Sequence, residues 1–403
     1  MKVKWFSGLA LLVLVLFSPL VIATAEEGDA LQNNGEEIAV NKTVEPGAYV
    51  KGEVVVQFKD RVSASKQEQI LQDVGAKVQA TPEVVRSPFL VLEVGNVDAV
   101  VNALSKNKNV EFAEPNYILK AAWSPNDTYF SPSYQYGLFN TSANSAWDVA
   151  RGSSSQEIAV LDTGVDYNHP DLDGKTIRGY DFVDRDYTPS DLNGHGTHVA
   201  GIAAAETNNG TGIAGMAPNT RILAVRVLDA NGSGSLANIA NGIRYAADNG
   251  AEVINLSLGC ACDTRALEDA VNYAWNRGSV VVAAAGNDGT SQQFQPASYA
   301  NAIAVGAVDR NNNKASFSNW GTWVDVAAPG VDIASTYPGN RYVYLSGTSM
   351  ASPYVAGQAA LLTGQGRSNS QVRAAIQNTT DSMNGSGYYV RYGVINAYNA
   401  VRY

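Results

Sequence analysis

Cysteine and charged residues are scarce in this chain, and both shortages exclude broad classes of protein. Two cysteines among 403 residues cannot build a scaffold that depends on disulfides. Charged residues make up only 16% against 45% hydrophobic ones, so a substantial core can form and general disorder is excluded. The formal net charge of −10 argues against a nucleic-acid partner. The sequence also has no internal repeat and no low-complexity tract.

Long hydrophobic runs are absent too, except at the N-terminus. Two lysines there precede an apolar run over residues 9–16, and an Ala-Thr-Ala sequence at 23–25 provides a small-residue cleavage site. These features predict a signal peptide over residues 1–25 and a secreted, extracellular protein. A membrane anchor is the alternative, but the run from 5 to 22 is at the short end for a span. We therefore expect no stable association with a membrane.

A small α+β domain is predicted after a polar lead over residues 26–48. Its hydrophobic pattern alternates between strands and amphipathic helices and ends near residue 119. Strands are expected at 53–58, 89–94 and 110–115, and helices at 64–74 and 97–105. This order is that of a split βαβ, ferredoxin-like fold.

From residue 123 to 403 the sequence predicts a larger α/β domain. Short, continuously hydrophobic strands alternate with alanine-rich helices, which indicates a parallel sheet covered by helices on both faces, in three layers. Strands are expected at 157–162, 222–227, 253–257, 280–285, 303–305 and 324–326, and helices at 195–205, 236–248, 265–276, 350–364 and 369–378.

Polar residues stand where such a sheet gathers its functional groups, at the carboxyl ends of strands. Asp162 closes one strand, Asn287 follows another, and His195 begins a helix between two glycines. A histidine can act as a base near neutral pH, an aspartate can orient it, and a side-chain amide can donate to an oxyanion. These three residues therefore lack only a nucleophile for acyl transfer.

Ser349 is the candidate nucleophile. It lies in a small-residue turn, 345–353, that leads into an apolar run predicting a buried helix. Pro353 is expected in the first turn of that helix, where a missing N–H is tolerated. Unpaired N–H groups at a helix N-terminus favour developing negative charge, which suits a reacting hydroxyl. A serine that merely caps the helix is the alternative.

Other chemistries fit the sequence less well. An α/β-hydrolase needs a histidine after its serine, yet the three histidines, at 169, 195 and 198, all precede Ser349. An aspartic peptidase needs a second copy of the Asp-Thr-Gly at 162–164, so only a homodimer would serve. A zinc site at His195 and His198 lacks the Glu between them, and we expect His198 to pack against the core.

The four motifs, in this order, resemble those of the subtilisin-like serine peptidases, from about Trp123 to Tyr403. Segments such as 222–229 and 271–276 are most similar to the family's thermitase-like branch from thermophilic bacilli, so heat stability is expected. Residues 49–118 resemble the family's propeptide, an intramolecular chaperone and inhibitor. The resemblance implies a broadly specific endopeptidase of proteins and peptides, with a propeptide at 26–122 and a catalytic domain at 123–403.

The same resemblance implies that the precursor cleaves itself near the bond between Ala122 and Trp123, and that the mature enzyme is a monomer. Asp162, His195 and Ser349 would form the triad, and Asn287 would hold the oxyanion. A binding or inhibitory protein on an inactive protease scaffold is the alternative. The four intact catalytic positions argue against it.

A substrate cleft is also implied by the resemblance. The walls of the primary specificity pocket would be Ser257, Leu258 and Gly259 on one side and Ala284, Ala285 and Gly286 on the other, while Gly232, Ser233 and Gly234 would pair with an extended substrate. Without the resemblance, the glycines indicate only turns. Cys260 and Cys262 follow the first wall and in an exported protein can form a tight disulfide or remain thiols.

Carboxylates crowd the loop 181–188, and their mutual repulsion suits a hard cation such as Ca²⁺, unless the loop is simply solvated. The resemblance points to calcium here, at Asp181, Asp184, Asp186 and Thr188. It implies a tighter calcium site at Asp127, Asp171, Glu206, Asn209, Thr211 and Ile213, and a weaker site for a monovalent cation at Ala297, Tyr299 and Ala302. Loss of the metal should loosen the mature N-terminus and promote autolysis.

Overall fold

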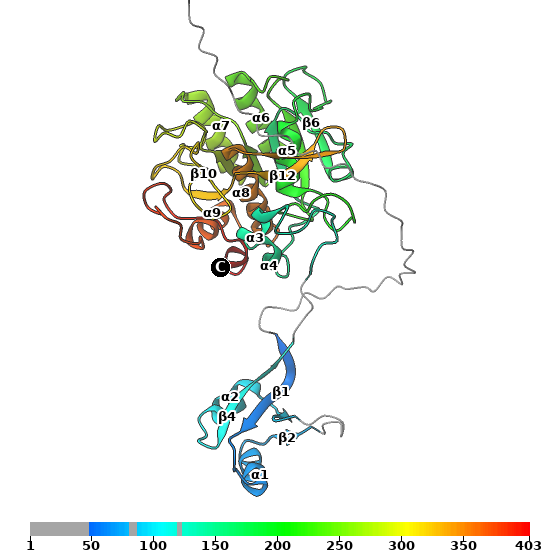
Figure 1. The fold of residues 1–403 in the computed structure, drawn as a ribbon, viewed down its shortest axis with the longest axis vertical. Coiled ribbons are helices and arrows are strands. Elements are labelled where there is room, and N and C mark those ends of the chain that lie inside the picture. The colour runs from blue at the N-terminus through cyan, green and yellow to red at the C-terminus, as the bar shows by residue number, and fades with distance from the viewer. Residues whose placement is uncertain (1–47, 80–86, 119–122) are drawn as a thin grey trace, which may run out of the picture. The chain divides into compact units, whose positions relative to one another are not determined.

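The computed structural model describes residues 48–79, 87–118 and 123–403, which form two compact units (Figure 1). The predicted signal peptide, the polar lead up to residue 47 and the residues just before Trp123 lie outside the described residues. In the described part of the chain, no helix is long and apolar enough to cross a membrane.

The smaller unit, 48–118, is an antiparallel sheet with two helices. Its elements are β1 (Tyr49–Phe58), α1 (Ala64–Asp73), β2 (Lys77–Val78), β3 (Leu90–Glu93), α2 (Val97–Ser105) and β4 (Val110–Tyr117), with the strand order β2-β3-β1-β4. This is the ferredoxin-like arrangement. Alternate residues of β1, Val54 and Val56, are buried with Leu104 of α2. The sequence pattern missed β2 because two residues are too few to show a period.

A parallel sheet of seven strands forms the centre of the larger unit, in the order β11-β10-β9-β8-β5-β7-β6. The strands are β5 (Glu157–Asp162), β6 (Thr176–Asp181), β7 (Arg221–Arg226), β8 (Val253–Leu256), β9 (Val280–Ala284), β10 (Ala302–Val308) and β11 (Val326–Pro329). A separate hairpin consists of β12 (Ile333–Tyr337) and β13 (Arg341–Leu345). Every residue of β8, β9, β10 and β11 is buried, as expected for strands covered on both faces.

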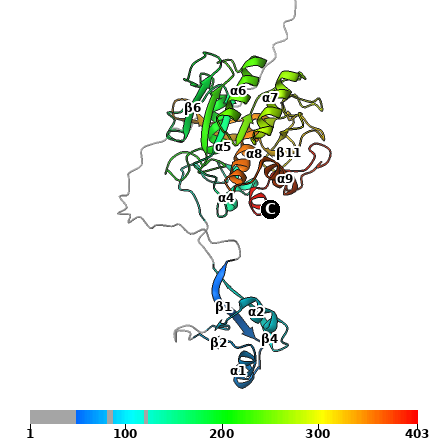
Figure 2. The same ribbon diagram turned by 180° about the vertical axis from the view of Figure 1, so that it is seen from behind.

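Helices cover both faces of this sheet, as Figures 1 and 2 show from opposite sides. One face packs against α5 (His195–Ala204), α8 (Thr348–Thr363) and α9 (Asn369–Asn378), with the short helices α3 (Tyr136–Asn140), α4 (Ala143–Ala146) and α10 (Ala397–Val401) in the same cluster. The other face packs against α6 (Leu236–Asp248) and α7 (Arg265–Asn276). The predicted three-layer α/β fold is confirmed.

Two strands differ from the predicted elements. The edge strand β6 was not predicted because its sequence, Thr-Ile-Arg-Gly-Tyr-Asp, mixes polar and apolar residues and has no continuous hydrophobic run. The strand expected at 324–326 begins instead at Val326 and extends to Pro329.

The helix that carries Ser349 also begins earlier than predicted, at Thr348. Pro353 is therefore the sixth residue of α8 and lies beyond its first turn, so the prediction of its position was wrong. Because proline has no N–H, it leaves the carbonyl of Ser349 without its helical partner. The Ser257 hydroxyl donates to that carbonyl instead, at 2.8 Å. The proline thus leaves the Ser349 carbonyl free to accept a hydrogen bond from Ser257, the residue that follows β8.

Candidate active site

Asp162, which is buried, and His195, which is half-buried, form a pair at the carboxyl edge of the sheet. Asp162, the last residue of β5, is fully buried, and its Oδ1 atom lies 2.7 Å from Nδ1 of His195. The same oxygen accepts the N–H of Thr163, also at 2.7 Å. Because Nδ1 faces a carboxylate, it carries the proton, and Nε2 is left free to act as a base.

The electrostatic surroundings of His195 favour its protonated form. Burial lowers the pKa of the imidazole, but the charge and hydrogen bond of Asp162, with a further contribution from the charge of Asp191, more than offset burial and raise the pKa above its usual value. His198, on the same helix, is fully buried, and burial lowers its pKa to about 3. Its Nε2 donates to the carbonyls of Ile333 and Val343, so His198 packs in the core as predicted.

Asp191 is a buried carboxylate that the sequence analysis did not single out. Its oxygens accept hydrogen bonds from the Thr163 hydroxyl at 2.8 Å, from the Thr197 hydroxyl at 2.6 Å, and from the N–H groups of Asn193, Gly194 and Thr197. Thr163 follows Asp162, and the other donors flank His195. Asp191 therefore joins the two ends of the acid–base pair through one side chain.

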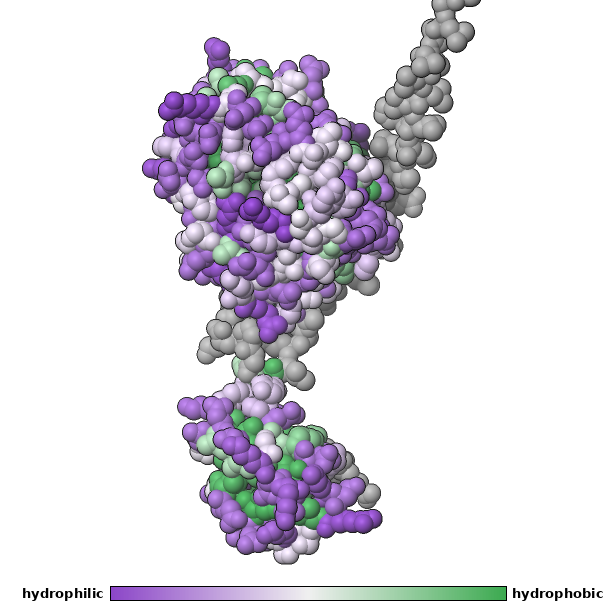
Figure 3. Space-filling model, turned by 90° about the vertical axis from the view of Figure 1, so that its left-hand side faces the viewer, coloured by the Kyte–Doolittle hydropathy of each residue, from purple (hydrophilic) through white to green (hydrophobic). Residues whose placement is uncertain are grey.

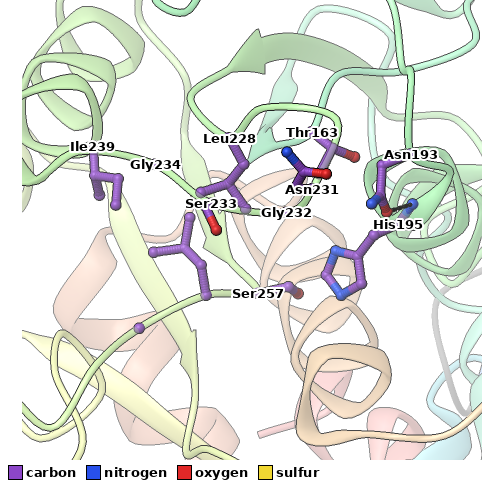
Figure 4. Close-up of a pocket in the computed structure, with 12 residues that line it drawn as sticks. Thr163, Asn193, His195, Leu228, Asn231, Gly232, Ser233, Gly234, Ile239 and Ser257 are labelled. Atoms are coloured by element: carbon purple, nitrogen blue, oxygen red, sulfur yellow. Dashed lines mark hydrogen bonds between the residues drawn. The ribbon is translucent and has the colours of Figure 1, made fainter.

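Ser349 is the second residue of α8 and lies beside Ser257. Its hydroxyl donates to the carbonyl of Ser257 at 3.1 Å, while the Ser257 hydroxyl donates to the carbonyl of Ser349. Figure 4 shows the His195 imidazole extending toward Ser257. Within the described residues, the Ser349 hydroxyl makes no hydrogen bond to His195, a contact that often tightens only when substrate binds.

Asn287 is held with its amide group in a defined orientation. Its Oδ1 atom accepts both the N–H of Thr348, at 2.8 Å, and the hydroxyl of Thr348, at 2.9 Å. With the oxygen occupied in this way, the NH₂ group remains available to donate. The N–H of Ser349 has no helical acceptor because it lies in the first turn of α8. The two donors meet the requirement of an oxyanion site.

A cavity of about 540 Å³ opens beside His195 (Figure 4). Its lining includes six of the predicted substrate residues, which are Gly232, Ser233, Gly234, Ser257, Leu258 and Gly259. Leu228 and Ile239, which the sequence analysis did not name, supply apolar surface to the same cavity. The predicted second wall, Ala284–Gly286, is fixed to α8 by the bond from the Gly286 N–H to the Thr348 hydroxyl at 3.1 Å, and Cys260 and Cys262 are joined by a disulfide.

The acidic loop 181–188 packs against a counter-charge that the sequence analysis overlooked. Arg226, the last residue of β7, is buried and contacts Asp181 at 2.8 Å and Asp184 at 2.6 Å. The remaining oxygen of Asp181 accepts the N–H groups of Val183 and Asp184, and Asp186 accepts the N–H of Thr188. Because Arg226 relieves the repulsion between these carboxylates, the physical argument for a cation is weaker here.

The tighter of the two predicted calcium sites fits a cation better. Asp127 and Asp171 are both buried, and neither forms an ion pair with an arginine or lysine within the described residues. Burial raises the pKa of both, that of Asp171 to about 6. Asn209 donates to Asp171 at 2.9 Å, and the N–H of Ile213 does so at 2.8 Å, so the predicted ligands at 171, 209 and 213 lie together. Buried carboxylates without a counter-charge suit a bound metal ion.

Metal ligands at these places would have to include oxygen atoms other than carboxylates. In the described residues, no three His, Cys, Asp or Glu side chains gather closely enough to hold an ion alone. Glu206, Thr211 and Ile213 would contribute backbone carbonyls, as the resemblance implies. At the predicted monovalent site, Ala297, Tyr299 and Ala302 are all buried, and the Tyr299 carbonyl accepts the N–H of Ala302 at 3.0 Å.

Comparison with known proteins agrees with this geometry. The subtilase family profile matches residues 153–394, and the fervidolysin N-terminal prodomain profile matches residues 35–116. The chain therefore belongs to the subtilase family and is a subtilisin-like serine endopeptidase with an N-terminal prodomain.

Several curated relatives cover most or all of the chain. A thermophilic serine proteinase from Bacillus sp. (strain AK1) is 63% identical over 403 residues, the whole of both chains. Thermitase from Thermoactinomyces vulgaris is 61% identical over 281 residues, which are 70% of this chain and all of thermitase. An alkaline protease from Alkalihalobacillus alcalophilus is 40% identical over 403 residues, 99% of this chain and 98% of the relative. The predicted family and its thermophilic branch are confirmed.

Proposed function

We propose that Ser349, His195, Asp162 and Asn287 hydrolyse peptide bonds of unfolded or extended protein segments. The observation that carries this proposal is the 2.7 Å contact between Asp162 and His195, with the imidazole extending toward the Ser257 backbone that binds Ser349. The four roles come from separate strand ends and helix starts. Their positions near the carboxyl ends of parallel strands, where functional groups gather, support this assignment.

The proposed reaction transfers one proton from Ser349 to His195 and then to the leaving group. Ser349 Oγ attacks the peptide carbonyl carbon and passes its proton to Nε2 of His195. The carbonyl oxygen becomes an oxyanion that accepts from the Asn287 amide and the Ser349 N–H. His195 then gives its proton to the leaving amine, which departs as the acyl-enzyme forms. Water, activated in the same way, hydrolyses the ester and restores the serine.

Substrate would lie extended across the cavity. Gly232, Ser233 and Gly234 form a turn fixed by Asp229, whose carboxylate accepts the N–H of Ser233 at 3.0 Å. Ser257, Leu258 and Gly259 form the opposite edge. Backbone pairing with these two segments would bind many sequences, so side-chain selection is left to the pockets.

A covalent probe tests this function. A fluorophosphonate should label the mature protein with one group per chain, and peptide mapping should place the label on Ser349. Labelled protein should be unable to hydrolyse casein. A folded mature protein that digests casein but remains unlabelled, or is labelled at another serine, would contradict the assignment.

The smaller unit is proposed to act as intramolecular inhibitor and chaperone. It exposes large hydrophobic side chains at Phe89, Phe112 and Tyr117, and Figure 3 shows hydrophobic surface gathered on this unit. Such patches are typical of interaction sites. The signal peptide predicted at 1–25 supports secretion, and self-cleavage near Trp123 would release a mature enzyme of residues 123–403 that we expect to be monomeric.

Calcium is proposed to bind at Asp127 and Asp171 together with the oxygens of residues 206, 209, 211 and 213. Asp127 accepts the N–H of Asn208 with both carboxylate oxygens, at 2.8 and 3.0 Å, so this site joins the segment that follows Trp123 to the loop after α5. A bound ion would neutralise two buried charges and hold the two segments together.

Removal of calcium should therefore shorten the lifetime of the mature enzyme. We expect a chelator to lower the melting temperature and to speed autolysis near residues 206–213, and added Ca²⁺ to restore both. Asp171→Asn should lower the melting temperature in calcium and reduce its response to the chelator. Asp173→Asn, an exposed neighbour, is the matched control. An unchanged chelator response in Asp171→Asn would remove Asp171 from the site.

A further inference from the structure

We propose that Phe294 fills the primary specificity pocket and restricts the enzyme to small side chains immediately before the bond that it cuts. This inference rests on the proposed function and names its substrate class. Phe294 lies in the loop between β9 and β10, and neither composition nor motif drew attention to it.

The location of the pocket follows from hydrogen bonds to the start of α8. The wall at 257–259 is joined to Ser349 through the Ser257 hydroxyl, and the wall at 284–286 is joined to Thr348 through the Gly286 N–H. The slot between the two walls therefore opens beside the nucleophile. The substrate residue whose carbonyl is attacked lies nearest to Ser349, so its side chain enters this slot.

The ring of Phe294 lies between the glycines that end the two walls. A β-carbon placed on Gly259 would stand 2.5 Å from Cε1 and 2.8 Å from Cδ1 of the ring. A β-carbon placed on Gly286 would stand 3.0 Å from Cγ and 3.1 Å from Cδ1. One edge of the ring thus occupies the space that a β-carbon at either glycine would need. The two glycines make room for Phe294, which leaves little of the slot for substrate.

The backbone around Phe294 cannot easily retreat from this position. Gln295 exchanges two hydrogen bonds with Cys260, at 2.8 and 2.9 Å, and thereby fastens the loop to the end of the first wall. The Phe294 carbonyl accepts the N–H of Ser298 at 3.0 Å. The backbone of Phe294 and that of Gln295 are therefore both anchored.

The shape of the cavity beside His195 is consistent with a slot between the two walls that Phe294 fills. The cavity next to His195 is lined by the first wall, Ser257 to Gly259, but not by Ala284, Ala285 or Gly286. It extends from the first wall toward Leu228 and Ile239. Large substrate side chains therefore find room farther from the bond that is cut.

A series of peptide anilides that differ only in the residue before the anilide tests the proposal. For the wild-type enzyme, kcat/KM should be at least about tenfold higher with alanine than with phenylalanine at that position. Phe294→Ala should raise kcat/KM for the phenylalanine substrate by about 10- to 100-fold and change that for alanine by less than about threefold. Phe294→Leu should admit leucine but still reject phenylalanine.

Phe139→Leu, a half-buried phenylalanine on α3, is the matched control and should keep the wild-type preference. A wild-type enzyme that prefers phenylalanine, or an active Phe294→Ala variant with an unchanged preference, would overturn the role of Phe294. If the wild-type protein is not labelled by the fluorophosphonate and cleaves none of the peptides, the proposed function itself would be refuted. If Phe294→Ala does not fold, the wild-type ratio and Phe294→Leu decide the question.

Discussion

The Ser349→Ala precursor should fold but remain uncut, and it should not react with a fluorophosphonate. The substitution removes the nucleophile and one hydrogen bond, from the Ser349 hydroxyl to the Ser257 carbonyl, while the bond from the Ser257 hydroxyl to the backbone of residue 349 can persist. The start of α8 should therefore stay in place. We expect kcat to fall by about 10⁶-fold, the usual cost of removing this nucleophile in a catalytic triad of this kind.

Gel electrophoresis and mass spectrometry of the secreted protein check this expectation. Ser346→Ala is a suitable control because Ser346 is exposed and lies three residues away, and its hydroxyl bonds only to Asp332, whose N–H it accepts and to whose Oδ1 it donates. That variant should mature as the wild type does. Normal maturation of Ser349→Ala in a host without other subtilases would show that a different group cuts the precursor.

Motifs in the sequence could predict the catalytic residues because each sits where a regular element starts or ends. Asp162 ends β5, and His195 begins α5, at positions that the hydrophobic pattern alone locates. A parallel sheet then brings these ends to one edge. For Asp162 and His195, the hydrophobic pattern of the sequence and the position in the folded sheet therefore lead to the same prediction.

The supporting residues could not be predicted in the same way. Asp191 acts through five donors that the folded loop brings to it, and Arg226 reaches Asp181 only because β6 and β7 are neighbours in the sheet. Phe294 meets Gly259 and Gly286 across segments that are far apart in the sequence. Their roles depend on contacts between distant segments, which cannot be predicted from hydrophobic periodicity or from short sequence motifs.

Replacement of Asp162 by asparagine should lower kcat by about 10⁴-fold with little change in fold. Oδ1 of Asp162 accepts both Thr163 N–H and His195 Nδ1, while Oδ2 is buried without a partner among the described residues. If the asparagine oxygen takes the place of Oδ1, the imidazolium loses its counter-charge and the NH₂ group is buried unsatisfied. If the NH₂ group faces His195, the imidazole must adopt the wrong tautomer.

The pH profile separates this electrostatic loss from simple misfolding. Asp162 raises the pKa of His195, so the pKa should fall in Asp162→Asn. Since His195 must be neutral to accept the serine proton, activity rises as pH increases through this pKa. The acid limb of kcat/KM should therefore move to lower pH in the variant, although the plateau is much lower.

Because self-processing needs activity, the variant precursor must be cut by a trace of tagged wild-type enzyme, which is then removed. Asp166→Asn is the matched control, since Asp166 lies four residues away and accepts only backbone N–H groups, from Asn168 and Gly339. It should retain both the plateau and the acid limb of the wild type. An Asp162→Asn enzyme with the wild-type acid limb and kcat would show that the buried carboxylate does not govern the base, and the assigned triad would then be wrong.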